Sequence, residues 1–173
     1  MRKIFHFDTP SEPYMAGAAV LCCFDHRINL AVRKFLQRNA IAQPDMIVVA
    51  GGAKTLASPR NDSQRDFILE QIRLSIDLHA CSRVILMNHS DCGTYGGLKQ
   101  FKGDRHAEAA YHKTELQRAA EIVESQFPGV RVETYFVNFE GIWALEEEGS
   151  REPGAAGQSK SRRLEASPSR RGE

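Results

Sequence analysis

Residues 18–27 read Ala-Ala-Val-Leu-Cys-Cys-Phe-Asp-His-Arg, and this stretch decides how the rest of the chain is interpreted. Its first seven residues are apolar and a charged segment follows them, which is typical of a buried β-strand. Side chains alternate between two faces along an extended chain, so Cys23, Asp25 and Arg27 are expected to point to one side. The stretch therefore predicts a strand that ends in a cluster of reactive side chains.

Outward from this strand, apolar runs alternate with segments of helical spacing. The apolar runs predict three further strands, at residues 46–50, 84–88 and 130–138. Apolar residues that recur every three or four positions predict helices over residues 28–39, 63–79 and 107–127. The second of these helices is expected to begin with a capping box at residues 63–66. The order β-α-β-α-β-α-β predicts an α/β fold, in which helices connect the strands of a mainly parallel sheet.

The composition is that of one ordinary globular domain followed by a polar tail. The 173 residues are 42% hydrophobic and carry a net charge of +1, which gives no general reason to expect nucleic acid or a membrane as a partner. No run approaches the ~20 apolar residues of a membrane-spanning helix. Residues 149–173 contain one large apolar residue, Leu164, and six basic residues, so they cannot bury enough surface to fold. We predict a folded domain over residues 1–148 and a disordered tail over residues 149–173.

The cysteines and the region before them predict a cytoplasmic protein. Residues 16–24 are apolar enough to resemble the core of a signal peptide. However, Asp8 and Glu12 precede this run where a leader would be basic, and Asp25-His26-Arg27 replaces the small residues of a cleavage site. In a cytoplasmic chain, the four cysteines are better explained as metal ligands or core residues than as disulfides.

A second motif, His89-Ser90-Asp91-Cys92, directly follows the third predicted strand. If the first and third strands are neighbours, the strand order is 2-1-3-4. Both motifs then open into the crevice where that order reverses, which is where open α/β sheets bind ligands. Cys23, His89 and Cys92 are therefore predicted to bind one zinc ion. Three ligands of this type leave the fourth tetrahedral position open, as in catalytic zinc sites.

The remaining candidates are given structural roles. Cys22 and Cys81 are expected to lie in the core. Asp91 is expected to cap or brace the turn of the second motif. His112, on a face of the third predicted helix, is expected to be solvated.

The paired motifs Cys-x-Asp-x-Arg, at residues 23–27, and His-x-x-Cys-Gly, at residues 89–93, make the chain resemble the β-class carbonic anhydrases. The resemblance also covers Pro-Asp-Met-Ile-Val-Val-Ala-Gly-Gly at residues 44–52, similar to that family's strand and glycine-containing loop beside the metal. It implies a three-layer fold with a four-stranded sheet of order 2-1-3-4 flanked by helices. It also implies an intimate homodimer and the reversible hydration of CO2 to bicarbonate.

Carried over residue by residue, the resemblance implies zinc ligands at Cys23, His89 and Cys92, a dyad of Asp25 and Arg27, and a substrate pocket lined by Gly51 and Gly52. Water or hydroxide would occupy the fourth position on zinc. Asp25 would accept a hydrogen bond from the zinc-bound hydroxide, and Arg27 would hold Asp25 off the metal through a bidentate pair. Only 22 residues precede Cys23 and the apolar pattern ends near residue 145, so the domain is expected to be shortened at both ends.

Three other functions stay open from the sequence. A related zinc hydrolase of another small linear substrate, such as carbonyl sulfide or carbon disulfide, would differ in pocket access and size. A non-catalytic zinc-binding regulator would keep the ligands without turnover. A nucleotide-binding α/β domain ranks last, because Gly51-Gly52 and the glycines at residues 93–97 form neither a G-x-G-x-x-G fingerprint nor a Walker loop.

Overall fold

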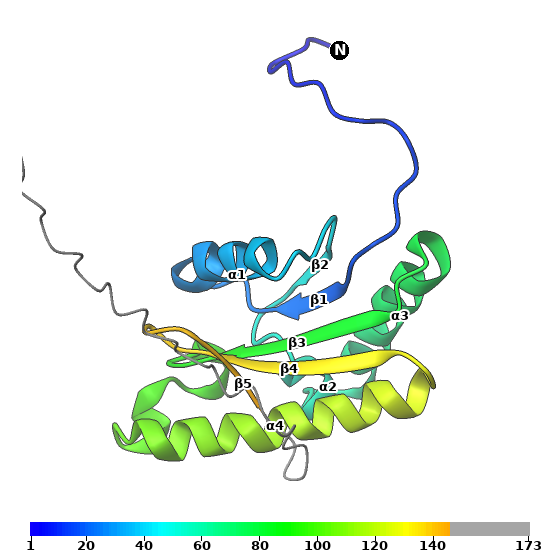
Figure 1. Ribbon diagram of the computed structural model, residues 1–173. Coiled ribbons are helices and arrows are strands. Elements are labelled where there is room, and N and C mark those ends of the chain that lie inside the picture. The colour runs from blue at the N-terminus through cyan, green and yellow to red at the C-terminus, as the bar shows by residue number, and fades with distance from the viewer. Residues whose placement is uncertain (146–173) are drawn as a thin grey trace, which may run out of the picture.

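The computed structural model describes residues 1–145 and contains a five-stranded sheet with helices on both faces (Figure 1). The sheet has the order β2-β1-β3-β4-β5, with the first four strands parallel and β5 antiparallel to β4. The strands are β1 (Ala19–Cys22), β2 (Asp45–Val48), β3 (Arg83–His89), β4 (Arg131–Val137) and β5 (Ile142–Ala144). The predicted α/β class and the order 2-1-3-4 are confirmed, while the predicted strand count was one too low.

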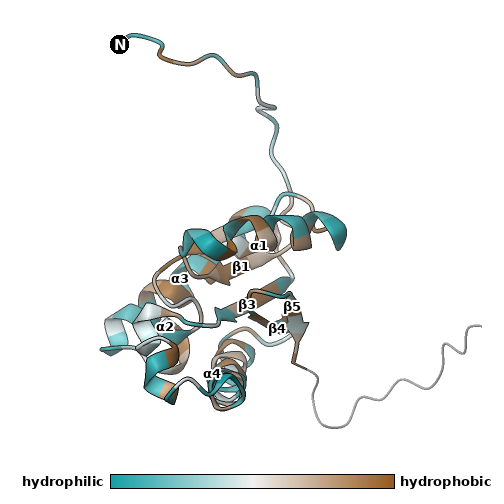
Figure 2. Ribbon diagram, turned by 90° about the vertical axis from the view of Figure 1, so that its left-hand side faces the viewer, coloured by the Kyte–Doolittle hydropathy of each residue, from teal (hydrophilic) through white to brown (hydrophobic). Residues whose placement is uncertain are grey.

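Four α-helices and two short 3-10 helices connect these strands within the described residues. The α-helices are α1 (His26–Arg38), α2 (Lys54–Ala57), α3 (Asp62–His79) and α4 (Arg105–Gln126), and the 3-10 helices are η1 (Gly93–Tyr95) and η2 (Leu98–Phe101). Helix α1 packs on one face of the sheet, and α2, α3 and α4 pack on the other. Figure 2 shows mainly hydrophobic strands between these layers and hydrophilic residues on the side of α1 turned away from the sheet.

The central strand β1 separates two hydrophobic clusters by the alternation of its side chains. Ala19 and Leu21 belong to the cluster under α2, α3 and α4, whereas Val20 and Cys22 belong to the cluster under α1. All four side chains are buried, as expected for a strand of a parallel sheet that is covered on both faces. Because β1 has no exposed face, its position in the sheet is tightly fixed.

The pairing of β1 with β3 brings the two sequence motifs to the same edge of the sheet. The two strands run parallel with Ala19 opposite Val84 and Leu21 opposite Leu86. Their carboxyl ends therefore lie side by side, and the segments that follow them leave the sheet together. The predicted meeting of the two motifs at this edge is confirmed.

Strand β5 was missed because it is too short to show an alternating pattern. It follows a tight turn in which Asn138 Oδ1 accepts hydrogen bonds from the N–H groups of Glu140, at 2.9 Å, and Gly141, at 2.8 Å. This asparagine-centred turn reverses the chain and sends three residues back along β4.

The predicted capping box at residues 63–66 was wrong by two positions. Helix α3 begins after Asn61, whose Oδ1 accepts a hydrogen bond of 3.1 Å from the N–H of Gln64. The Gln64 side chain in turn accepts from the N–H of Arg60 at 3.0 Å. Asparagine is at least as good an N-cap as serine, so the helix can begin two residues earlier than predicted.

The predicted boundary at residue 148 and the predicted tail over residues 149–173 lie outside the described residues. At the other end, residues 1–15 are exposed; the first of them run away from the sheet (Figure 1), while the Tyr14 hydroxyl donates to Asp45 at the start of β2. Within residues 1–145, no helix has both the length and the apolar character that would let it span a bilayer.

A matched pair of substitutions in α1 tests the packing of this helix on the sheet. Leu36 is 4% exposed and Leu30 is 65% exposed. Leu36→Ala is expected to lower the free energy of unfolding by about 2–5 kcal/mol, because it leaves a cavity in the core. Leu30→Ala should change it by less than about 0.5 kcal/mol. Urea denaturation measures both values, and equal losses in the two variants would contradict this placement of α1.

Candidate metal centre

Cys23, His89 and Cys92 converge at the carboxyl edge of the sheet. Cys23 directly follows β1, His89 is the last residue of β3, and Cys92 immediately precedes η1. All three side chains are buried, and one sulfur or ring-nitrogen atom from each lies within 4.8 Å of the others. The structure thus brings together the three residues that were predicted as ligands, in an arrangement that could hold a metal ion.

The ring of His89 is oriented for a ligand that the protein does not itself provide. Its Nδ1 lies 2.8 Å from the carbonyl oxygen of Ser90, which assigns the proton to Nδ1. Its Nε2 is buried and has no hydrogen-bond partner among the described residues. A histidine that donates through one nitrogen to a carbonyl and keeps a free lone pair on the other is the usual arrangement of a metal-bound imidazole.

The two sulfur atoms have different surroundings. The N–H of Gly51 donates to Cys23 Sγ at 3.3 Å, and the hydroxyl oxygen of Thr94 lies 3.1 Å from Cys92 Sγ. The neighbouring Cys92 raises the pKa of Cys23 to about 12, and the neighbouring Cys23 lowers the pKa of Cys92 to about 6. One proton is therefore held between the two thiols, and a metal bound through both sulfurs would displace it, because cysteine binds metals as the thiolate.

Gly51 and Gly52 lie beside this cluster, at positions where the backbone conformation and the surroundings exclude a side chain. Both have positive φ angles, 83° and 55°. A Cβ atom on Gly52 would lie 2.3 Å from the carbonyl oxygen of Met87. The glycines let the loop after β2 pass close to β1 and β3, and this brings the Gly51 N–H to Cys23. Their lining of a substrate pocket stays a prediction.

Asp25 and Arg27 form a close ion pair at the start of α1. Asp25 caps this helix by accepting a hydrogen bond of 2.9 Å from the Arg27 N–H. The guanidinium of Arg27 donates from Nη2 at 2.7 Å and from Nε at 3.0 and 3.1 Å to the carboxylate of Asp25. These bonds lower the pKa of Asp25 to about 2. An oxygen of this carboxylate lies 3.9 Å from the free Nε2 of His89, so the pair borders the metal-ligand cluster.

Arg27 also binds the loop between His89 and Cys92. Its Nη1 donates to Asp91 Oδ2 at 2.9 Å, and its Nη2 donates to the Asp91 carbonyl at 3.0 Å. The other carboxylate oxygen of Asp91 accepts from the N–H of Leu98 at 2.9 Å. Asp91 therefore braces the turn of the second motif, as predicted.

Glu108 is a buried support of this turn that sequence reasoning missed. Its carboxylate accepts from the Ser90 hydroxyl at 2.5 Å and from the Asp91 N–H at 2.6 Å. Glu108 lies in α4, eight residues before Leu116, which is also buried. The apolar register of this helix, extended backwards in steps of four from Leu116, passes through His112 and Glu108. That register was the available signal.

The prediction that His112 is solvated was wrong. The side chain is 0% exposed and contacts Tyr95 and Phe136, with ring centroids 4.5 and 5.2 Å away. Burial lowers the pKa of His112 to about 4, so the ring is neutral at physiological pH. His112 follows the buried register of α4, and aromatic contacts replace the expected hydration.

A cavity of about 480 Å³ opens beside the ion pair. Asp25, Arg27 and Asp91 line it together with Lys99 and three glycines, Gly93, Gly96 and Gly97. A small molecule in this cavity would meet the paired carboxylate of Asp25 next to the metal-ligand cluster.

Comparisons with known proteins agree with this fold. A family model described as "Putative carbonic anhydrase" matches residues 15–146. An uncharacterized protein of Rickettsia bellii is 23% identical over 140 residues, which cover 79% of this chain and 84% of that protein. A carbonic anhydrase from Streptococcus mutans superposes with a TM-score of 0.56 and 14% identity, covering 80% of this chain and 88% of the other. The apo form of a carbon disulfide hydrolase gives a TM-score of 0.52 and 17% identity, with coverages of 84% and 89%.

The role of Glu108 can be tested against an exposed acidic residue in the same helix. Glu108→Ala would leave the Ser90 hydroxyl and the Asp91 N–H without their acceptor. We expect the free energy of unfolding to fall by about 2 kcal/mol or more, because each buried unsatisfied group costs about 1–3 kcal/mol. Glu124→Ala, at an exposed position of α4, should have little effect. If the two variants are equally stable in urea, Glu108 does not support the turn.

Proposed function

The chain belongs to the family described as "Putative carbonic anhydrase", and from this premise we propose that it is a zinc-dependent carbonic anhydrase. The proposed reaction is the reversible hydration of CO2 to bicarbonate. One observation carries the proposal: the buried cluster of Cys23, His89 and Cys92 lies next to an aspartate that is paired with an arginine.

The donor set of this cluster fits zinc. Two cysteine sulfurs and one imidazole nitrogen are ligands that zinc prefers, and three protein ligands leave one position for a reactant. The buried Nε2 of His89, which has no partner in the described part of the chain, supports a ligand at this point. When bound, zinc would supply a Lewis acid that makes water nucleophilic near neutral pH.

In the proposed reaction, the chain's own residues position the reactants. Asp25 would accept a hydrogen bond from the attacking water or hydroxide through an oxygen that faces His89. The pKa of about 2 keeps this carboxylate ionised at neutral pH, so it acts as an acceptor only. Arg27 would keep Asp25 in place, because a guanidinium that holds both carboxylate oxygens restrains the side chain from moving onto the metal.

A second candidate reaction is the hydrolysis of carbon disulfide or carbonyl sulfide. The similarity in fold to a carbon disulfide hydrolase supports this second candidate. The same metal ligands would serve either substrate, so measuring the release of hydrogen sulfide alongside CO2 hydration separates the two. A non-catalytic zinc-binding regulator is the third candidate, and it would hold zinc without turnover of any of these substrates.

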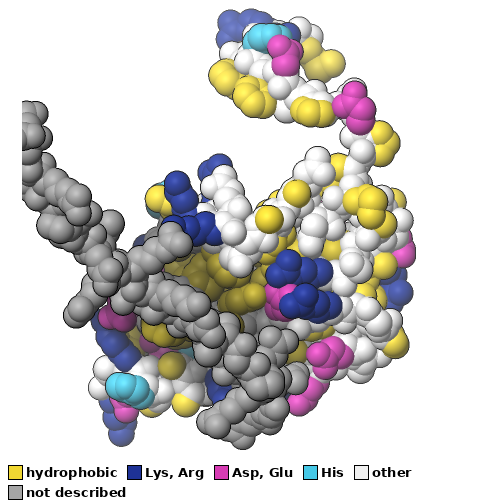
Figure 3. Space-filling view, in the orientation of Figure 1, with side chains coloured by type: hydrophobic (Ala, Val, Ile, Leu, Met, Phe, Trp, Pro, Cys, Tyr) yellow, Lys and Arg dark blue, Asp and Glu magenta, His cyan; other side chains and the backbone are white. Residues whose placement is uncertain are grey.

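We further propose that the protein is a cytoplasmic homodimer or higher homo-oligomer with no nucleic-acid or membrane partner. Its four cysteines are all free thiols, which supports a reducing compartment. The N-terminal segment carries exposed apolar side chains (Figure 3), and Met46 and Val48 are exposed on the edge strand β2. A second copy of the chain that covered these side chains would remove them from water, which supports the proposed oligomer. In the N-terminal segment these side chains are Ile4, Phe5, Phe7 and Met15.

Zinc stoichiometry tests the ligand assignment. The purified full chain is expected to hold about one zinc ion, and Cys92→Ala should lose nearly all of it because two remaining ligands chelate poorly. Cys22→Ala removes the neighbouring buried thiol at the end of β1, which lies outside the proposed ligand set, and should retain the metal. Elemental analysis measures all three proteins. Full zinc retention in Cys92→Ala would rule out the assignment.

Stopped-flow CO2 hydration tests the reaction and the ion pair. The zinc-loaded protein should be active. Arg27→Ala and Asp25→Asn should each lower kcat/KM by about 100-fold or more while zinc is retained, because a small misplacement of the reactants can cost about 100-fold. Arg33→Ala changes an exposed arginine of the same helix and should leave the rate unaffected. Activity equal to that of the unchanged protein in both variants would remove the ion pair from the mechanism.

A further inference from the structure

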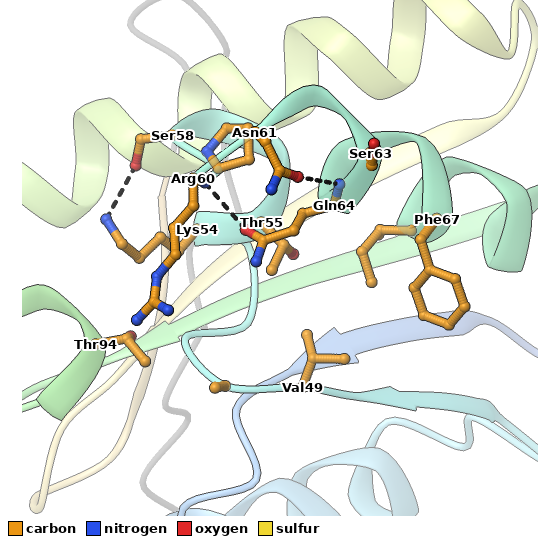
Figure 4. A pocket seen from close by; sticks show the side chains of 13 residues that line it. Val49, Lys54, Thr55, Ser58, Arg60, Asn61, Ser63, Gln64, Phe67 and Thr94 are labelled. Atoms are coloured by element: carbon orange, nitrogen blue, oxygen red, sulfur yellow. Dashed lines mark hydrogen bonds between the residues drawn. The ribbon is translucent and has the colours of Figure 1, made fainter.

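A second cavity, of about 470 Å³, lies between the end of β2, helix α2 and the start of α3 (Figure 4). It shares no lining residue with the cavity beside Asp25 and Arg27. We propose that this second cavity binds a small organic anion, with a carboxylate or phosphate group at one end and an apolar portion at the other. The proposal goes beyond the proposed reaction, because CO2 and bicarbonate have no apolar portion of this kind.

The charge of the cavity favours an anion. Lys54 and Arg60 line it, and no aspartate or glutamate among the described residues does so. Within residues 1–145, neither cation forms an ion pair with a carboxylate. Figure 4 places the charged ends of both side chains at the same end of the cavity, near Thr94. Two uncompensated cations at one end of a cavity repel each other, and a bound anion would relieve this repulsion.

Lys54 is held in place by groups that leave its charge available. Its Nζ donates to the Ser58 hydroxyl at 3.3 Å and lies 4.4 Å from the centre of the Tyr95 ring. The Ser58 hydroxyl donates to the buried carboxylate of Glu115, which also accepts from Arg118 Nη1 at 3.3 Å. The negative charge behind Ser58 is therefore shared with Arg118, and Lys54 has no carboxylate as a direct partner within residues 1–145.

The beginning of α3 fixes the loop that carries Arg60. Helix α3 has 18 residues, and its first turn lines the cavity through Ser63 and Gln64. The N–H of Gln64 is capped by the side chain of Asn61 at 3.1 Å, which holds this turn in one conformation. The side chain of Gln64 accepts from the Arg60 N–H at 3.0 Å, so the loop before the helix is tied to its first turn.

The other end of the cavity is apolar. Val49 and Phe67 lie there, away from the charged ends of Lys54 and Arg60 (Figure 4). Phe67 is 58% exposed, although a phenylalanine side chain gains free energy when it is covered. A volume of about 470 Å³ falls within the range of small-molecule sites, which is about 300–1,000 Å³. The cavity therefore fits an amphipathic anion better than a bare inorganic ion.

The cavity also adjoins the candidate metal centre. Thr94 lines it, and the Thr94 hydroxyl oxygen lies 3.1 Å from Cys92 Sγ. Only the side chain of Thr94 would then lie between an anion at the charged end and Cys92, a proposed metal ligand. Binding there has a direct structural path to the metal centre through a single side chain.

Titration of the isotope-labelled full chain by NMR tests this proposal. The probes are benzoate, as a carboxylate with an apolar portion, phenyl phosphate, as the matching phosphate ester, and inorganic phosphate, as an anion without one. Saturable shifts of the Thr55, Ser63 and Gln64 amides are expected with at least one of the two organic probes, and the probe that binds more tightly identifies the anionic group. Inorganic phosphate should bind more weakly than phenyl phosphate.

Charge variants make the test specific. Lys54→Gln and Arg60→Gln should each weaken binding by about tenfold, the effect of losing one charge-assisted hydrogen bond. Arg33→Gln, on α1 across the sheet, should not change the affinity. Arg60 is an exposed loop residue, so its variant is expected to fold and is decisive by itself. The proposal is overturned if neither organic probe gives saturable shifts, if the shifts are confined to Asp25, Arg27 and Asp91, or if Arg60→Gln binds as tightly as the unchanged protein.

Discussion

The guanidinium of Arg27 is the contact on which the candidate site depends. It donates to the carboxylate of Asp25, two residues after Cys23, and to the carboxylate and carbonyl of Asp91, one residue before Cys92. One planar group thereby joins the two loops that carry the proposed ligands. A lysine could not replace it, because an ammonium group lacks the rigid fork that bonds to two acceptors in fixed directions.

The sheet brings these loops within reach of Arg27, and this part of the structure could be predicted from the sequence. The strand at residues 18–24 and the helical spacing after it predict a parallel sheet with helical crossovers. The reversal of strand order then places Cys23 beside His89. Such inferences succeed because the pairing of β1 with β3 depends on buried apolar strands, and buried strands leave a clear pattern in the sequence.

Other parts of the site were not predicted, because their contacts depend on which side chains meet in three dimensions. Glu108 reads as an exposed acid of a charged helix, and only the position of α4 beneath the turn shows that it binds Ser90 and Asp91. His112 was assigned to solvent for the same reason, although its register with Leu116 pointed to the core. Lys54 and Arg60 gave no signal at all, since the cavity that they line forms where the end of β2, helix α2 and the start of α3 come together.

The candidate metal centre and the second cavity meet at Thr94, whose backbone belongs to the short helix after Cys92. The proposed function depends on the metal centre being where the structure places its ligands. X-ray absorption at the zinc edge of the full-length, zinc-loaded protein tests this most directly. Zinc held by Cys23, His89 and Cys92 should show two sulfur atoms at about 2.3 Å and one or two nitrogen or oxygen atoms at about 2.0–2.2 Å. A spectrum with only nitrogen and oxygen neighbours, or with four sulfur neighbours, would contradict it.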